Sequence, residues 1–210
     1  PSGREMSLGA DSALRRISEA RGATDGTAAS HHRTNVREVM GRNCGYLALV
    51  SALSSGADYV FIPERPPEVD DWAEDLCEKI KFNKQAGKKK SLIIIAEGAK
   101  DKHGNPIKSH HVVDELKNRI NADARLTILG HVQRGGAPTA FDRYMSTVLG
   151  YAAVKHLIEN SEDMESQIIA LQQNRVRAIP LMESIRKTQS IVKLVEEKDF
   201  DGAIKLRGGG

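Results

Sequence analysis

The sequence predicts an α/β fold with a mainly parallel sheet, and two observations support this prediction. Short apolar runs of strand length alternate with longer stretches in which apolar residues recur at helical spacing. Residues 91–96 (SLIIIA) are apolar and β-branched without alternation, which is typical of a parallel strand buried on both faces. The 210 residues are enough for one domain or for two closely joined lobes.

The individual elements follow from local patterns. The helix that carries Trp72, Leu76 and Ile80 has acidic residues in its first turn, where the helix dipole favours them. Residues 101–106 (DKHGNP) have turn chemistry, and 130–136 form a loop flanked by glycines. The other predicted helices are 7–21, 44–54, 112–120, 139–158 and 181–195, and the predicted strands are 34–40, 59–62, 91–96, 126–129 and 167–171.

Composition excludes several classes of protein. Hydrophobic residues at 40% and charged residues at 28% are ordinary globular values. No apolar run approaches the roughly 18 residues that span a bilayer, so no membrane partner is expected. We also expect no secretory signal, because the first thirty residues lack an apolar core. A net charge of +3 with 4% aromatic residues argues against nucleic-acid binding.

The cysteines, histidines and lysines suggest neither a disulfide framework nor a metal site. Two cysteines favour a reducing, cytoplasmic compartment, and both are interpreted as structural. The basic run 88–90 precedes a strand and is interpreted as a solvated turn. No metal is assigned, because the paired histidines lack a third partner at ligand spacing: His31, His32, His110 and His111.

Polar residues and glycines follow three of the predicted strands. In parallel sheets ligands collect where the strands end, and these three segments would share that edge. Glycines allow close backbone approach, and arginine offers a planar fork to phosphate oxygens. The sequence therefore predicts a phosphate site with a carboxylate for sugar hydroxyls, built from Met40, Gly41 and Arg42, from Glu97 and Gly98, and from 131–136 (HVQRGG).

Each of these segments also has an ordinary structural explanation. A Gly-Arg pair after a strand is usually a turn, and Glu97 could cap the next segment. His131 could be a buried histidine, and Arg33 and Arg125 could be solvent-facing flanks of their strands. The functional hypothesis rests on the occurrence of these residues at equivalent strand ends of one sheet.

Several motifs in fixed order resemble the ATP-dependent 6-phosphofructokinase family. They are 38–50 (EVMGRNCGYLALV), 56–64 (GADYVFIPE), 93–98 (IIIAEG) and 129–143 (LGHVQRGGAPTAFDR), within a resemblance that runs from about 6 to 208. The chain is most similar to the amino-terminal half of the duplicated eukaryotic subunit. The carboxy-terminal half typically has MGG and QQGG, so Arg42 and Arg134 point to a catalytic sugar site.

The resemblance implies a three-layer α/β/α sandwich with an incomplete nucleotide lobe. Residues 7–132 and 181–208 would belong to the sugar-phosphate lobe, and 133–180 to the nucleotide lobe. The implied reaction is glycolytic: the γ-phosphoryl of ATP, with Mg²⁺, passes to the 1-hydroxyl of fructose 6-phosphate and gives fructose 1,6-bisphosphate. Two alternatives remain, a pyrophosphate-dependent relative, which Cys44-Gly45-Tyr46 disfavours, and a non-catalytic sugar-phosphate binding or assembly module.

The resemblance also assigns roles residue by residue. Met40 and Gly41 would lie at the fructose 6-phosphate site, with Arg42 near the transferred phosphoryl group as the catalytic residue. Glu97 would accept bonds from sugar hydroxyls, while His131 and Arg134 would hold the phosphate. Arg33 and Arg125 match arginines that reach the sugar phosphate from a neighbouring subunit, which implies an allosteric homo-oligomer. Asp58 matches an acidic effector-site residue of bacterial relatives.

The chain differs from the family pattern in two motifs that lie before the matched region and at several single positions. The glycine-rich nucleotide loop and the aspartate that acts as general base precede the matched region, so we expect the chain alone to be inactive. Asn43 and Ala10 replace the usual His and Thr. Asn35 and Arg37 occupy one face of a strand whose counterparts are apolar. Either this face is solvated, or Arg37 has a carboxylate partner such as Asp25 or Asp58, because a buried unpaired arginine costs several kcal/mol.

Overall fold

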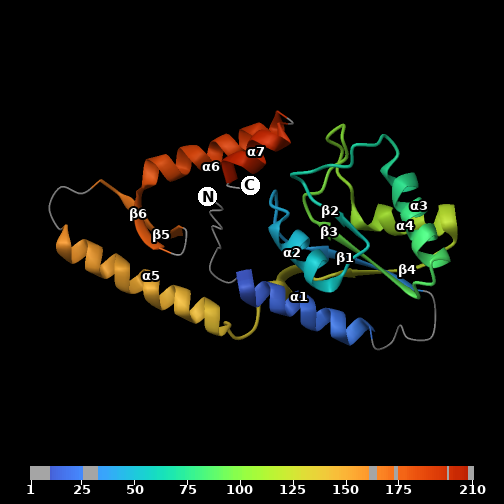
Figure 1. Cartoon of the computed structure of the whole chain (residues 1–210), viewed down its shortest axis with the longest axis horizontal. Coiled ribbons are helices and arrows are strands. Elements are labelled where there is room, and N and C mark those ends of the chain that lie inside the picture. Colours follow the sequence, from blue (N-terminus) through green and yellow to red (C-terminus); the bar gives the residue numbers. More distant parts are fainter. Residues whose placement is uncertain (1–9, 26–32, 161–164, 173–174, 198, 208–210) are drawn as a thin grey trace. The chain divides into compact units, whose positions relative to one another are not determined.

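The computed structural model describes residues 10–25, 33–160, 165–172, 175–197 and 199–207. It divides into two compact units (Figure 1). One is Ser12–Gly136, and the other is Ala137–Gly210 with Pro1–Asp11.

The first unit is built on a parallel four-stranded sheet in the order β2-β3-β1-β4. Its strands are β1 (Arg33–Val39), β2 (Tyr59–Phe61), β3 (Lys90–Ala96) and β4 (Asp123–Ile128). Val39 pairs with Ala96, and Glu38 pairs with Ile128. The carboxyl ends of the three longer strands therefore lie at one edge, and the predicted parallel sheet is confirmed.

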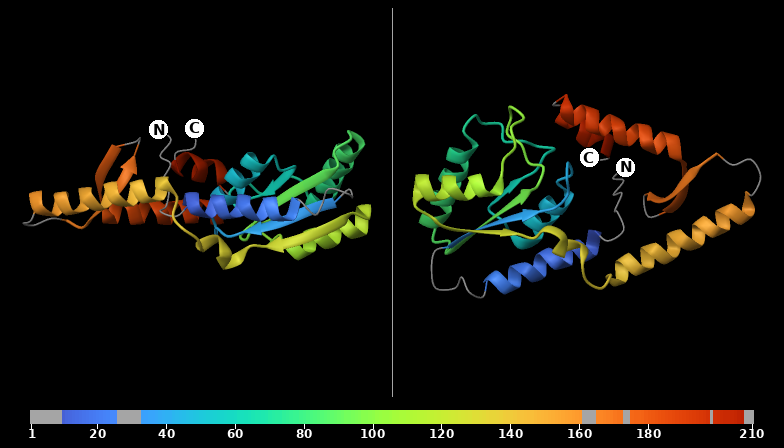
Figure 2. Two further views of the ribbon diagram at one scale, coloured as in Figure 1. Left: turned by 90° about the horizontal axis from the view of Figure 1, so that it is seen from below. Right: turned by 180° about the vertical axis from the view of Figure 1, so that it is seen from behind.

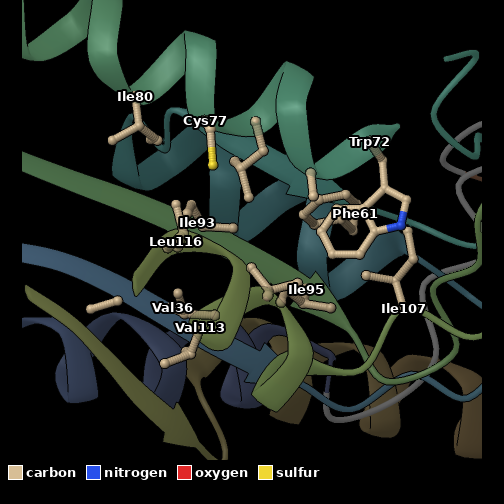
Figure 3. Packing of buried hydrophobic residues seen from close by; sticks show 14 of the residues in the cluster. Val36, Phe61, Trp72, Cys77, Ile80, Ile93, Ile95, Ile107, Val113 and Leu116 are labelled. Carbon is tan, nitrogen blue, oxygen red and sulfur yellow. The ribbon is translucent and has the colours of Figure 1, made fainter. Parts of the chain in front are cut away.

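Helices cover both faces of this sheet, as the views in Figure 2 show. Helices α3 (Trp72–Gln85) and α4 (Ser109–Ile120) pack on one face, and α1 (Ala10–Asp25) and α2 (Tyr46–Ser55) on the other. Alternate residues of β3 enter the two cores: Ile93 and Ile95 face α3 and α4, whereas Ile94 faces α1 and α2. The α3 and α4 side is drawn in Figure 3. Each such side chain contributes about 1.5–3 kcal/mol by leaving water.

The face of β1 that carries Asn35 and Arg37 is buried, so the first of the two alternatives, a solvated face, is wrong. Arg37 is 1% exposed and Asn35 is 9% exposed. Asp58, one of the two suggested partners, accepts bonds from the Asn83 amide at 2.6 Å and the backbone N–H of Leu92 at 2.8 Å. The side chain of Asp25, the other suggestion, lies outside the described residues.

The described residues of the second unit form two antiparallel strands and three helices. Strands β5 (Gln167–Gln172) and β6 (Arg175–Pro180) pair antiparallel, with Gln167 opposite Pro180. The helices are α5 (Ala140–Glu159), α6 (Leu181–Glu196) and α7 (Phe200–Arg207). A capping box between Thr139 and Asp142 begins α5. Strand β6 and helix α7 were not predicted. Within the described residues, no helix combines the length and apolar character that crossing a membrane requires.

Candidate functional site

The segments that follow β1, β3 and β4 start side by side at the carboxyl edge of the first sheet. The backbone N–H of Glu97 donates to the Val39 carbonyl at 3.0 Å, and that of Leu129 donates to the Glu38 carbonyl at 3.2 Å. The structure therefore brings together six of the predicted site residues at this edge: Met40, Gly41, Arg42, Glu97, His131 and Arg134.

Glu97 holds the loop after β1 in place. Its Oε1 atom accepts hydrogen bonds from the backbone N–H groups of Gly41, at 3.3 Å, and of Arg42. Arg42 has a φ of 51°, in the left-handed region that residues with side chains rarely adopt. A Cβ at Gly98 would collide with the Arg42 carbonyl oxygen, so only glycine permits this approach of the two loops. The carboxylate thus stabilises a strained turn that exposes the Arg42 side chain.

Glu64, which follows β2, fixes the start of α2. Both of its carboxylate oxygens accept from the backbone N–H of Gly45, at 2.9 and 2.8 Å, and the residue is 6% exposed. The Cys44 N–H donates to the Gly41 carbonyl at 2.9 Å and closes the turn between β1 and α2. A buried negative charge at a helix N-terminus is favourable because that end carries partial positive charge. Sequence analysis did not assign Glu64 a role.

Most of the predicted glycine-flanked loop 130–136 forms a 3₁₀ helix, η2 (Gly130–Arg134). In such a helix, residues three apart eclipse each other, so His131 and Arg134 lie on one side. Both are exposed, whereas Gln133 between them is 3% exposed. The predicted alternative of a buried histidine at His131 is wrong, because this side chain is open to solvent.

Helix α1 contributes a further arginine that sequence analysis missed. The Nε atom of Arg16 donates to the Gly135 carbonyl at 3.2 Å, and its guanidinium also pairs with Glu19 at 2.9 Å. A Cβ at Gly136 would collide with this guanidinium. The two glycines after Arg134 were the available signal, since they mark a place where another group approaches the backbone closely.

Arg33 and Arg125 lie at the opposite edge of the sheet. Arg33 is the first residue of β1 and pairs with Asp123, while Arg125 pairs with Asn35. The Asp123 carboxylate accepts from both arginines at 3.1 Å. The hydrogen bond from Arg33, together with the positive charge of Arg125, lowers the pKa of Asp123. At about 3.3 Å per strand residue, Arg33 lies roughly 20 Å from Val39 at the carboxyl edge, and the position of Arg125, opposite Asn35, lies roughly 13 Å from it.

Basic residues surround this amino edge of the sheet. Arg33 and Asp123 line a hollow of about 170 Å³ together with Lys81, Lys84, Lys88 and Lys89. Lys88 and Lys89 are exposed, as predicted for a solvated turn, and the Lys88 Nζ atom pairs at 2.5 Å with Asp58, whose side chain is 3% exposed. Lys90 already belongs to β3. In the part of the chain that the structure describes, no three His, Cys, Asp or Glu side chains are arranged to hold a metal ion.

Fold and site together define a parallel α/β protein with exposed arginine and histidine side chains and a carboxylate at the carboxyl edge of its sheet. The family model for phosphofructokinase matches residues 2–157, and the chain belongs to that family. The predicted resemblance is thereby confirmed.

Individual relatives agree with this assignment. The chain is 51% identical over 207 residues to the liver-type ATP-dependent 6-phosphofructokinase of Bos taurus, covering 99% of this chain and 26% of the relative. A solved phosphofructokinase from Saccharomyces cerevisiae is 44% identical, with a TM-score of 0.93 over 98% of this chain and 28% of that one. The T-state enzyme of Pichia pastoris is 47% identical, with a TM-score of 0.87 over 93% and 21% respectively. The chain thus spans about a quarter of the length of these relatives.

Proposed function

We propose that this chain supplies the fructose 6-phosphate site of an ATP-dependent 6-phosphofructokinase. The enzyme would transfer the γ-phosphoryl of ATP to the sugar 1-hydroxyl and form fructose 1,6-bisphosphate in cytoplasmic glycolysis. The observation that carries the proposal is the convergence of three strand ends that expose Arg42, His131 and Arg134 at one edge. ATP as the donor is supported by the description of the bovine relative as ATP-dependent.

The site suits a sugar phosphate because it offers both positive charge and a hydroxyl acceptor. Arg42 would stand near the transferred phosphoryl group, where phosphoryl transfer needs charge neutralisation. His131 and Arg134 would hold the 6-phosphate, the arginine with its planar fork. The Oε1 atom of Glu97 accepts hydrogen bonds from the loop amides. The remaining lone pairs of the carboxylate would accept hydrogen bonds from sugar hydroxyls.

Arg33 and Arg125 would serve the site of a neighbouring subunit in a homo-oligomer. The place of Arg33 at the amino edge supports this part of the proposal, since roughly 20 Å of strand separates it from the carboxyl edge. Arg125 shares the Asp123 carboxylate with Arg33. Substrate bound across an interface would favour one quaternary arrangement, which is the requirement for allosteric cooperativity. Asp58 remains a proposed effector-site residue on the resemblance alone.

The proposed lobes are 7–132 with 181–208 for sugar phosphate and 133–180 for the nucleotide. The first compact unit ends at Gly136, close to the proposed boundary between the two lobes at 132–133. Helix α6 belongs to the same unit as β5 and β6, so the assignment of 181–208 rests on the resemblance. Magnesium is implied by the family, but the described residues provide no cluster of donors that fits it, and we assign it no step.

The test is a steady-state assay of the complete protein that carries this chain, with ATP, Mg²⁺ and fructose 6-phosphate. We expect fructose 1,6-bisphosphate as the product, and a large loss of kcat in Arg42→Ala. Calorimetric titration with fructose 6-phosphate measures binding separately. Binding without turnover would support the non-catalytic alternative, and neither binding nor turnover would refute both proposals.

A further inference from the structure

Gln133 is a buried polar side chain between two exposed residues of the proposed site. It is 3% exposed, whereas His131 and Arg134 in the same 3₁₀ helix are open to solvent. A buried amide is costly unless it is hydrogen-bonded, and it offers both an acceptor and two donors. Two of these groups have partners in the structure, and the partners belong to different segments.

The first bond lies within η2 itself. The Nε2 atom of Gln133 donates to the Gly130 carbonyl at 3.2 Å. Gly130 has a φ of 51°, so the chain turns sharply where β4 leads into η2. The bond spans this turn and fixes the side chain relative to the backbone that carries His131.

The second bond crosses to the loop after β1. The Oε1 atom of Gln133 accepts from the backbone N–H of Met40 at 3.4 Å, a long bond between residues 93 positions apart. Met40 directly precedes Gly41 and Arg42, whose N–H groups are held by Glu97. The same loop is therefore held by two side chains, one from the end of β3 and one from η2.

We infer that Gln133 is a positioning residue that couples the turn bearing His131 and Arg134 to the loop bearing Arg42. The inference rests on the proposed function, because the two segments would hold opposite ends of one sugar phosphate. Gln133 itself would contact no substrate. Its effect is geometric, since a displacement of about 1 Å between two binding segments is enough to weaken binding and catalysis substantially.

Three variants of the complete protein separate this role from general stability. Gln133→Met keeps the length of the side chain and removes both bonds. Gln133→Glu keeps an oxygen for the Met40 N–H. Val113→Ala, in the core between the sheet and α3 and α4, is the matched control, because it loosens packing without touching either segment.

Gln133→Met should raise the KM for fructose 6-phosphate about tenfold, near the upper end of what a neutral hydrogen bond supports. The KM for ATP should change less than about twofold, and hydrogen exchange at the Met40 amide should become faster. Gln133→Glu should keep the Met40 amide protected and raise the KM less. Val113→Ala should lower Tm and leave the KM for fructose 6-phosphate unchanged.

The inference is overturned if Gln133→Met leaves that KM unchanged, or if Val113→Ala raises it equally. Should Gln133→Met not fold, Gln133→Asn takes its place, since its amide is one methylene too short to span both partners. If the unaltered protein neither binds nor phosphorylates fructose 6-phosphate, the proposed function fails instead. The exchange rate at the Met40 amide then decides the coupling alone: faster exchange supports it, and an unchanged rate refutes it.

Discussion

Arg33 and Arg42 stand at opposite ends of the same strand. Arg33 is the first residue of β1, and Arg42 follows its last residue, Val39, by three positions. Because a strand rises about 3.3 Å per residue, Arg33 lies roughly 20 Å from Val39, at the opposite edge of the sheet. One ligand bound by both arginines would need two copies of the chain.

Subunit mixing tests this arrangement. The Arg33→Ser, Arg125→Ser protein and the Arg42→Ala, Arg134→Ala protein should each be inactive. Co-assembled, they should regain part of the activity, because some sites then draw both sets of arginines from intact copies. Activity is measured on oligomers whose mixed composition has been confirmed by native mass spectrometry, and a complete lack of recovery there would contradict the shared site.

Arg134→Ala should raise the KM for fructose 6-phosphate far more than the KM for ATP. The expected loss is roughly 2 to 4 kcal/mol, the range for a charged hydrogen-bonded pair shielded from water. Arg65→Ala is the matched control, since that arginine is 75% exposed and lies outside the proposed site. An equal rise in both KM values would place Arg134 in a different subsite.

Glu64→Leu should destabilise the first unit by about 1 to 3 kcal/mol, because the Gly45 N–H would be buried without an acceptor. Urea unfolding followed by circular dichroism gives the free energy of unfolding. Glu68→Leu provides the comparison, since that side chain is 86% exposed and should have little effect. Equal stabilities of the two variants would show that the Gly45 contact contributes nothing.

Gly98→Ala and Gly150→Ala should act in opposite directions. A Cβ at Gly98 would meet the Arg42 carbonyl, so we expect a loss of about 1 to 3 kcal/mol and weaker sugar-phosphate binding. Gly150 lies inside α5 with open space around a built Cβ, so alanine should stabilise by about 0.5 to 1 kcal/mol. Thermal unfolding gives the Tm of each variant. A Gly98→Ala protein whose Tm equals that of the unaltered protein would argue against the close approach of the loops.

Asp123→Asn should remove a pH-dependent part of the stability. The pKa of Asp123 is lowered in the folded protein, by the Arg33 hydrogen bond and the charge of Arg125, so folding favours the carboxylate. This contribution to stability is present when the pH is above 3.8, the ordinary pKa of an aspartate. It is lost as the pH falls through the lower pKa that Asp123 has in the folded protein. The difference in Tm between the unaltered protein and the variant should therefore shrink on acidification. A difference that grows at low pH would be inconsistent with the depressed pKa.

The strands of the first unit were predictable because their chemistry is local. The run 92–96 has no polar position, and β3 sends alternate isoleucines into two cores. The turn at 101–106 is equally local, and Lys100 and Pro106 form an isolated antiparallel bridge there. In both cases neighbouring residues alone determine the backbone preference.

Other elements depend on partners distant in the chain. Strand β6 alternates arginine with apolar residues and lacks a clear apolar run, yet it forms because β5 pairs with it over six residues. Arg37 carries the charge typical of an exposed position and is nevertheless buried, because α1 and α2 cover its face of the sheet. Local patterns do not report which surface another element will cover.

The sequence by itself determined which strand ends carry arginine, histidine, glycine and a carboxylate, and that these ends share an edge. That much follows from the parallel sheet, because β-strand direction fixes the end at which each motif lies. Only the tertiary structure decided that Glu97 holds the Arg42 loop, that Gln133 reaches Met40, and that Asp123 pairs with the distant Arg33. These are single hydrogen bonds and ion pairs between segments as far as 93 residues apart. Their geometry depends on register and loop conformation, which hydrophobic periodicity leaves undetermined.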